Sequence, residues 1–102
     1  MNREAKIQEL NRKNQREIRR GCNDIFETAR GKYLLETIRD VTPKLDDLAK
    51  QTIMLEVRKA YRSAKNSVTG EIVSGDLEFV CNEAIKAENR KPSRLLKRLF
   101  AA

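Results

Sequence analysis

The sequence predicts an all-α protein that folds as a single domain of four to five helices over residues 1–102. Apolar residues recur at the three- and four-residue spacing of amphipathic helices through most of the chain. The two prolines, Pro43 and Pro92, fall between these periodic segments, where a proline ends one helix or begins the next. Because a domain of this length buries only about two thirds of the surface that its unfolded chain exposes, we expect a thin core.

A long, basic N-terminal helix is expected over residues 1–26. On a helical wheel, Ile7 and Leu10 fall on a narrow apolar seam, and four arginines cluster on the opposite side. These are Arg12, Arg16, Arg19 and Arg20. Asn14 lies within the seam and is able to fix the register of a coiled coil with a second copy, although the heptad pattern fails at Glu17.

Thr28 is a suitable N-cap for a second helix over residues 29–40. Gly31, in the first turn of that helix, allows another stretch of backbone to come close. The helix is followed by a break, at which Thr42 serves as a cap and Pro43 suits the first helical position. We therefore expect the third helix to begin there, with acidic residues favouring its positive end.

The third helix, residues 45–66, is expected to be central and the most buried, because its apolar positions cover a wide arc of the wheel. Tyr61 falls within that arc, and Tyr33 of the second helix is likewise expected in the core. Residues 66–75 contain the pairs Thr-Gly and Ser-Gly, which predict a loop or a short hairpin.

The cleanest amphipathic pattern of the chain covers residues 77–89, where Asp76 or Ser74 is a suitable cap. Beyond Pro92, a short basic helix combines four large apolar residues with three cations, and a helix so short is stable only when it docks. Its apolar residues are Leu95, Leu96, Leu99 and Phe100, and its cations are Arg94, Lys97 and Arg98. This helix has three candidate docking sites, which are the core of its own domain, a groove of a partner and an anionic membrane.

Charge is concentrated at the two ends of the chain. Residues 1–20 hold seven basic and three acidic side chains, residues 90–102 hold five basic and no acidic ones, and the segment between them is slightly acidic. Two basic arms on a nearly neutral body predict binding to an anionic partner. The candidate contacts are Arg12, Arg16, Arg19, Arg20, Arg94, Lys97 and Arg98. The candidate protein-interface residues are Ile7, Leu10, Leu95, Leu96, Leu99 and Phe100.

The sequence offers little for catalysis. It has no histidine, no Walker-type or GxGxxG phosphate loop, and only Cys22 and Cys81 as thiols, so we expect no enzyme, metal or cofactor. Both cysteines fall on apolar stripes and are expected as small buried hydrophobes rather than as a disulfide. The polar start of the chain and the lack of a long apolar run predict a place in the host cytoplasm or a virion.

Residues 24–38 combine an aromatic residue, a threonine, a glycine followed by a basic residue, and spaced aliphatic residues. These are Phe26, Thr28, Gly31, Lys32, Leu35 and Ile38, and a looser match covers residues 60–68. The two stretches resemble the small phage-encoded domains called Bbp19-like. The resemblance implies a helical phage protein found among virion and assembly genes, without catalytic residues.

From the residues and this resemblance together, we expect a non-enzymatic phage structural or assembly component. It would bind neighbouring proteins, or a second copy of itself, through apolar helix faces and an anionic surface through its basic ends. The alternative is a free nucleic-acid-binding or host-takeover regulatory protein of the same fold. Whether the basic ends meet phosphates or the carboxylates of a protein stays open at this point.

Overall fold

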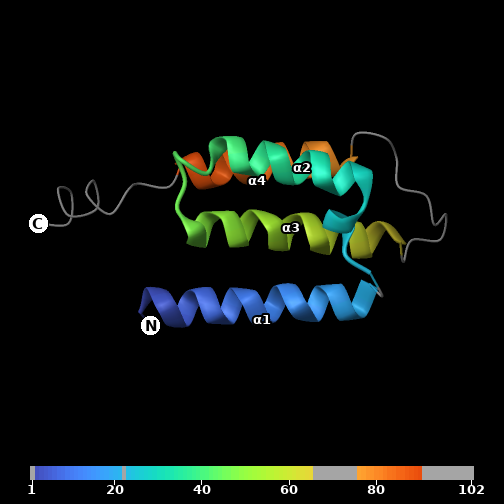
Figure 1. Cartoon of the computed structure of the whole chain (residues 1–102), viewed down its shortest axis with the longest axis horizontal. Helices are drawn as coiled ribbons and strands as arrows, with labels where there is room; N and C mark the ends of the chain where they lie inside the picture. The colour runs from blue at the N-terminus through green and yellow to red at the C-terminus, as the bar shows by residue number, and fades with distance from the viewer. Residues whose placement is uncertain (1, 22, 66–75, 91–102) are drawn as a thin grey trace, which may run out of the picture.

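The fold was analysed in a computed structural model, which describes residues 2–21, 23–65 and 76–90 (Figure 1). Over these ranges the chain forms four α-helices, one 3-10 helix and no strand, which confirms the all-α class. The elements are α1 (Arg3–Gly21), η1 (Ile25–Glu27), α2 (Ala29–Val41), α3 (Asp47–Lys65) and α4 (Asp76–Arg90). The loop expected at 66–75 and the basic helix expected after Pro92 lie outside the described residues.

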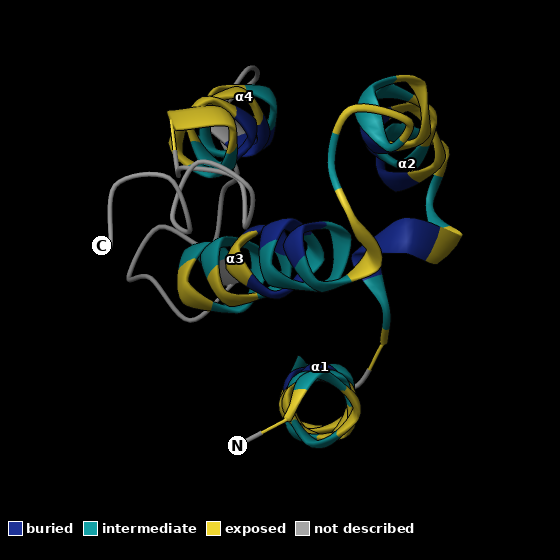
Figure 2. Ribbon diagram, turned by 90° about the vertical axis from the view of Figure 1, so that its left-hand side faces the viewer, coloured by how far each residue is buried: buried dark blue, intermediate teal, exposed yellow. Residues whose placement is uncertain are grey.

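α3 occupies the centre of the molecule, as the sequence predicts. It packs on α1 on one side and on α4 on another, and α2 packs on η1 and α4. Figure 2, viewed along the helices, shows α1 on the opposite side of α3 from α2 and α4. In Figure 1, α1 and α3 run in one direction and α2 and α4 run in the other. The central helix therefore buries two of its sides against different neighbours.

The hydrophobic core lies on the side of α3 that faces α2 and α4. Its buried members are Ile25, Phe26, Leu34, Ile38, Ile53, Val57, Leu77, Cys81 and Ile85. None of these residues belongs to α1, and the partly buried residues that pack against the cluster come from α2, α3, α4 and the turn between α2 and α3. α1 is therefore held on α3 by a separate set of contacts.

Two local predictions for the start of α2 are confirmed. The side chain of Thr28 caps the helix, because its hydroxyl oxygen accepts a hydrogen bond from the Gly31 N–H at 3.0 Å. Gly31 is buried where the backbone of η1 crosses α2, and a Cβ at this position would lie 2.7 Å from Cα of Phe26. The missing side chain is what lets η1 pack directly on α2.

The long N-terminal helix is shorter than predicted. α1 ends at Gly21, and Ile25 and Phe26 belong instead to η1, where Asp24 is the N-cap and accepts a hydrogen bond from the Phe26 N–H at 3.2 Å. Glycine is a poor residue for a helix interior, and aspartate competes for backbone N–H groups outside helices. The chain therefore leaves the line of α1, which allows Ile25 and Phe26 to enter the core.

The predicted start of the third helix at Thr42 and Pro43 is wrong. The Thr42 hydroxyl donates to the Ile38 carbonyl at 2.7 Å, so it serves the end of α2 rather than the start of α3. Asp46 is the cap of α3 instead, because its Oδ1 accepts a hydrogen bond from the Ala49 N–H at 2.8 Å. The acidic residues 46 and 47 do lie at the positive end of α3, as the sequence indicates.

The two tyrosines differ in burial. Tyr61 packs partly buried against the core, as predicted, whereas Tyr33 is 61% exposed on α2 and its prediction is wrong. Leu34 and Ile38 fill the core from α2 and turn Tyr33 outward.

Over the described ranges, no helix is both long enough and apolar enough to cross a membrane.

Candidate anion-binding surface on α1

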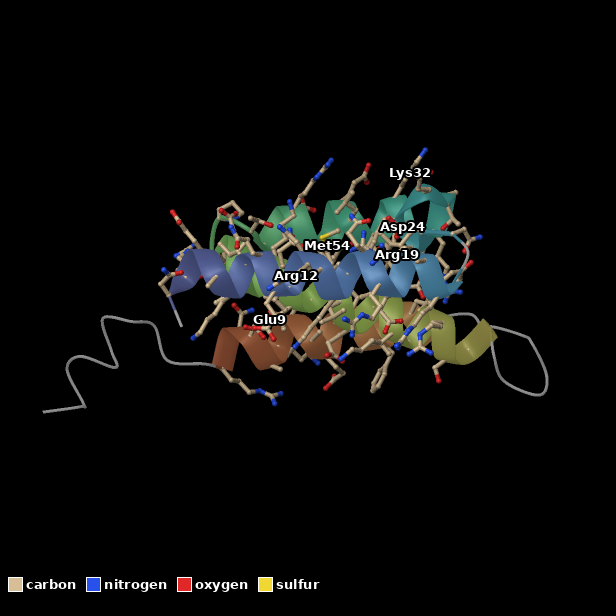
Figure 3. The ribbon with its side chains drawn as sticks, turned by 90° about the horizontal axis from the view of Figure 1, so that it is seen from below. Glu9, Arg12, Arg19, Asp24, Lys32 and Met54 are labelled. Atoms are coloured by element: carbon tan, nitrogen blue, oxygen red, sulfur yellow. The ribbon has the colours of Figure 1, made fainter. Side chains whose placement is uncertain are left out.

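The second half of α1 carries the arginine surface, which we define as Arg12, Arg16, Arg19 and Arg20. All four residues are exposed, and they lie on the side of the helix away from Asn14 and its contacts with α3. Figure 3 is seen from the side of α1, and its labelled Arg12 and Arg19 lie along that helix. The structure therefore brings together the four predicted anion contacts of the N-terminal helix.

No acidic side chain of α1 neutralises this surface. Of the three acids on the helix, Glu4 lies in the first turn, Glu9 pairs with Lys13 at 3.3 Å, and Glu17 is buried. The side chains of the four arginines form no ion pair or hydrogen bond with any other residue that the structure describes. Their guanidinium groups are left available for a partner. Arg19 and Arg20 also stabilise the negative end of the α1 dipole.

The orientation of α1 on α3 is set by Arg58 of α3. Its guanidinium binds the Asp24 carboxylate in bidentate fashion, at 3.1 and 2.9 Å, and donates to Asn14 Oδ1 at 2.7 Å. The same group lies 4.9 Å from the centre of the Phe26 ring. One side chain thus joins α1, the turn before η1 and α3 in an interaction from which water is largely excluded.

Asn14 itself is buried, with 3% of its surface exposed. Its Nδ2 donates to the Leu10 carbonyl at 3.0 Å and lies 3.3 Å from both the carbonyl and Oε1 of Gln51. Asn14 therefore does lie in the seam of α1, but its partners belong to α3 of the same chain. These contacts take the place of the coiled-coil register with a second copy that the sequence left open.

A second ion pair fixes the far end of the same interface. Arg62 of α3 binds both carboxylate oxygens of Glu17, and the hydrogen bond and charge of Glu17 raise the pKa of Arg62. Glu17 is only 7% exposed, so its charge is directed inward and is compensated there. Without this pairing, the carboxylate of Glu17 would lie free one turn from Arg20. Because Glu17 is paired inward, the second half of α1 exposes arginines and no carboxylate.

The other predicted contacts are not brought to this surface. Ile7 and Leu10 are half-buried on the side of α1 that bears Asn14, and their role as protein-interface residues stays a prediction. The remaining members of both predicted sets lie outside the described residues. They are Arg94, Leu95, Leu96, Lys97, Arg98, Leu99 and Phe100.

Arg58, Arg62 and Asp24 were not predicted to take part in the site. One signal for them exists in the sequence, because the apolar seam of α1 is interrupted by Asn14 and Glu17, and a seam position held by a charge requires a buried partner. A second signal is Leu55, an apolar residue that falls outside the main apolar arc of α3, on the side that bears Arg58 and Arg62. The structure buries it.

The described residues hold no group of side chains suited to a metal ion. Cys81 is a buried free thiol, which agrees with its prediction as a small hydrophobe, whereas Cys22 lies outside the described residues. Burial, and to a lesser extent the charge of Glu78, raise the pKa of Cys81 to about 11. The thiol is therefore protonated near neutral pH and unsuited to act as a nucleophile.

No protein-family model, curated protein or solved structure matches this chain.

Proposed function

We propose that this protein is a non-enzymatic phage structural or assembly component that attaches to an anionic partner through the arginine surface of α1. One observation carries the proposal: four exposed arginines follow one another on a single helix, and none has a counter-ion among the described residues. Surface arginines on stable proteins are usually interspersed with acids, and a run of one sign attracts a partner of the other.

The way α1 is held supports the same function. The helix adds no residue to the hydrophobic core, yet the Arg58 and Arg62 contacts fix its orientation on α3. Arg58 and Arg62 bind the carboxylates of Asp24 and Glu17, which would otherwise weaken the positive field around the arginine surface. The phage context rests on the resemblance of residues 24–38, and attachment to neighbouring proteins of the particle rests on the apolar positions of the two ends.

The proposal predicts that reversing Arg12, Arg16 and Arg19 to glutamate abolishes binding to a polyanion without unfolding the protein. The probe is a column of immobilised heparin, from which the full-length chain is eluted with a salt gradient. The wild type should be retained at 0.1 M salt, and the variant should pass through, because three attractions become repulsions. Far-UV circular dichroism should show the same helical spectrum for both, since all three residues are exposed.

A matched control separates the arginine surface from net charge. Lys32, Arg39 and Lys44 are exposed, lie on α2 and the turn after it, and have no ion pair among the described residues. Reversing these three to glutamate lowers the net charge by the same six units but should leave most of the retention in place. Equal loss of retention in the two variants, or none in either, would refute the role of α1.

A further inference from the structure

We infer that the partner of the arginine surface is the phosphate backbone of a double-stranded nucleic acid, which it binds without reading the base sequence. This inference rests on the proposed function and names the class of its anionic partner. Three observations carry it: the composition of the exposed side of α1, the spacing of its arginines and the position of the exposed aromatic residues.

The exposed side of α1 lacks the aromatic and apolar residues that protein interfaces bury at their centre. Every exposed residue of the helix is charged or carries an amide. They are Glu4, Lys6, Gln8, Asn11, Arg12, Lys13, Gln15, Arg16, Arg19 and Arg20. Arginines contribute to protein interfaces as well, but they do so beside buried aromatic and apolar residues, and the buried centre is otherwise poor in charge. A phosphate backbone needs no apolar anchor, because its contacts are ionic and the release of counter-ions drives the binding.

The arginines are spaced to follow a row of phosphates. With a rise of about 1.5 Å per residue, Arg12 and Arg16 are roughly 6 Å apart along the helix axis, and Arg16 and Arg19 roughly 4.5 Å. Phosphates of a duplex follow one another at about 3.4 Å of axial rise on each strand, so long arginine side chains reach successive groups. Each guanidinium is able to bind two phosphate oxygens at once. α1 is straight and packs on α3, so the arginines are presented along one line (Figure 1).

The same surface offers no aromatic side chain on which an unpaired base can stack. Proteins that bind single strands combine cations with aromatic side chains on one face. Here the exposed aromatic residues of the described chain are Tyr33 on α2 and Phe79 on α4, and both helices lie across α3 from α1 (Figure 2). A duplex keeps its bases paired and stacked, so a helix that contacts its phosphates needs no aromatic side chain. The geometry therefore favours a duplex over a single strand.

The test measures the affinity of the full-length chain for a fluorescently labelled 24-base-pair DNA duplex by anisotropy, between 50 and 200 mM salt. Three to four phosphate contacts predict that log K falls with log salt with a slope of about −3. Two duplexes of unrelated sequence should bind within about twofold of one another. Neutralising Arg12, Arg16 and Arg19 to glutamine should bring the slope from about −3 to between about −1 and 0, and neutralising Lys32, Arg39 and Lys44 should leave it nearly unchanged.

Two competitors decide between partner classes. An oligo(dT) of the same length and poly-L-glutamate should each displace the labelled duplex at least tenfold less well than unlabelled duplex does. Equal competition by poly-L-glutamate would overturn the inference in favour of an acidic protein, and stronger competition by oligo(dT) would overturn it in favour of a single strand. Either outcome would leave the proposed function in place, provided that retention on heparin still depends on the arginines of α1. If retention on heparin does not depend on them, the proposed function is refuted as well.

Discussion

Replacing Arg58 with alanine is expected to lower the free energy of unfolding by about 3 kcal/mol, which for a domain of this size lowers Tm by roughly 15 °C. The Arg58 side chain is 10% exposed and that of Asp24 is 16% exposed, so neither group is well solvated in the fold. The substitution leaves the Asp24 carboxylate and Asn14 Oδ1 without their donor, and it uncovers the ring of Phe26. The cost is mainly that of a buried charge with no partner.

Urea denaturation followed by far-UV circular dichroism measures this effect. Arg39→Ala is the matched control, because it removes an exposed arginine of α2 and should change the free energy of unfolding by less than about 0.5 kcal/mol. A double-mutant cycle with Asp24→Ala should return a coupling energy above about 1 kcal/mol between the two residues. If Arg58→Ala were no more destabilising than Arg39→Ala, the bidentate contact would have no part in holding α1.

Gly31→Ala should be strongly destabilising, by about 3 kcal/mol, although alanine is the better helix former by up to about 1 kcal/mol. The added methyl group would overlap the carbonyl group of Ile25 and approach Cα of Phe26 to 2.7 Å. Both obstacles are backbone atoms, which have no alternative rotamer to adopt. η1 would have to move away from α2, which would draw Ile25 and Phe26 out of the core.

Gly21→Ala is the natural control for this prediction. Gly21 ends α1, and a Cβ there would meet nothing within 4 Å, so alanine should be neutral or stabilise the protein by up to about 1 kcal/mol. Gly31→Ala should therefore lower the midpoint of urea denaturation strongly, whereas Gly21→Ala should leave the midpoint unchanged or raise it. A stabilising Gly31→Ala would contradict the close packing of η1 on α2.

The sequence was sufficient to predict those parts of the fold that depend on a continuous apolar stripe. α4 was expected over residues 77–89 and spans Asp76–Arg90, with Leu77, Cys81 and Ile85 all buried. The start of α2 was also predictable, because a threonine cap and a glycine in the first turn act locally. Apolar stripes and helix caps depend on residues close together in the sequence, so they can be recognised without knowing which element packs against the helix.

The attachment of α1 could not be predicted in the same way, because it depends on polar side chains whose pairing is set by the tertiary fold. Arg58 lies 34 positions from Asp24 and 44 positions from Asn14, and no local pattern marks these residues as partners. The ends of α1 and α3 were misplaced for a related reason. Several residues able to cap were close together, and in the fold Asp24 caps η1 and Asp46 caps α3.

The arginine surface was visible in the sequence as a row of cations, but its lack of counter-ions was not. Glu17 precedes Arg20 by three positions, and on an isolated helix it would offset part of the charge of Arg20. Burial of Glu17 against Arg62 removes that compensation. Fold and proposed function are therefore linked, since the contacts that hold α1 in place also leave its exposed side positively charged.

The most direct measurement of the central claim follows the arginine Nε–H signals of isotope-labelled protein by NMR while a short DNA duplex is added. We expect the signals of Arg12, Arg16 and Arg19 to shift, because their guanidinium groups would contact phosphates. The signals of Arg58 and Arg62, which are engaged by Asp24 and Glu17, should stay in place. Unchanged signals from the three α1 arginines at a duplex concentration that saturates binding would contradict the account.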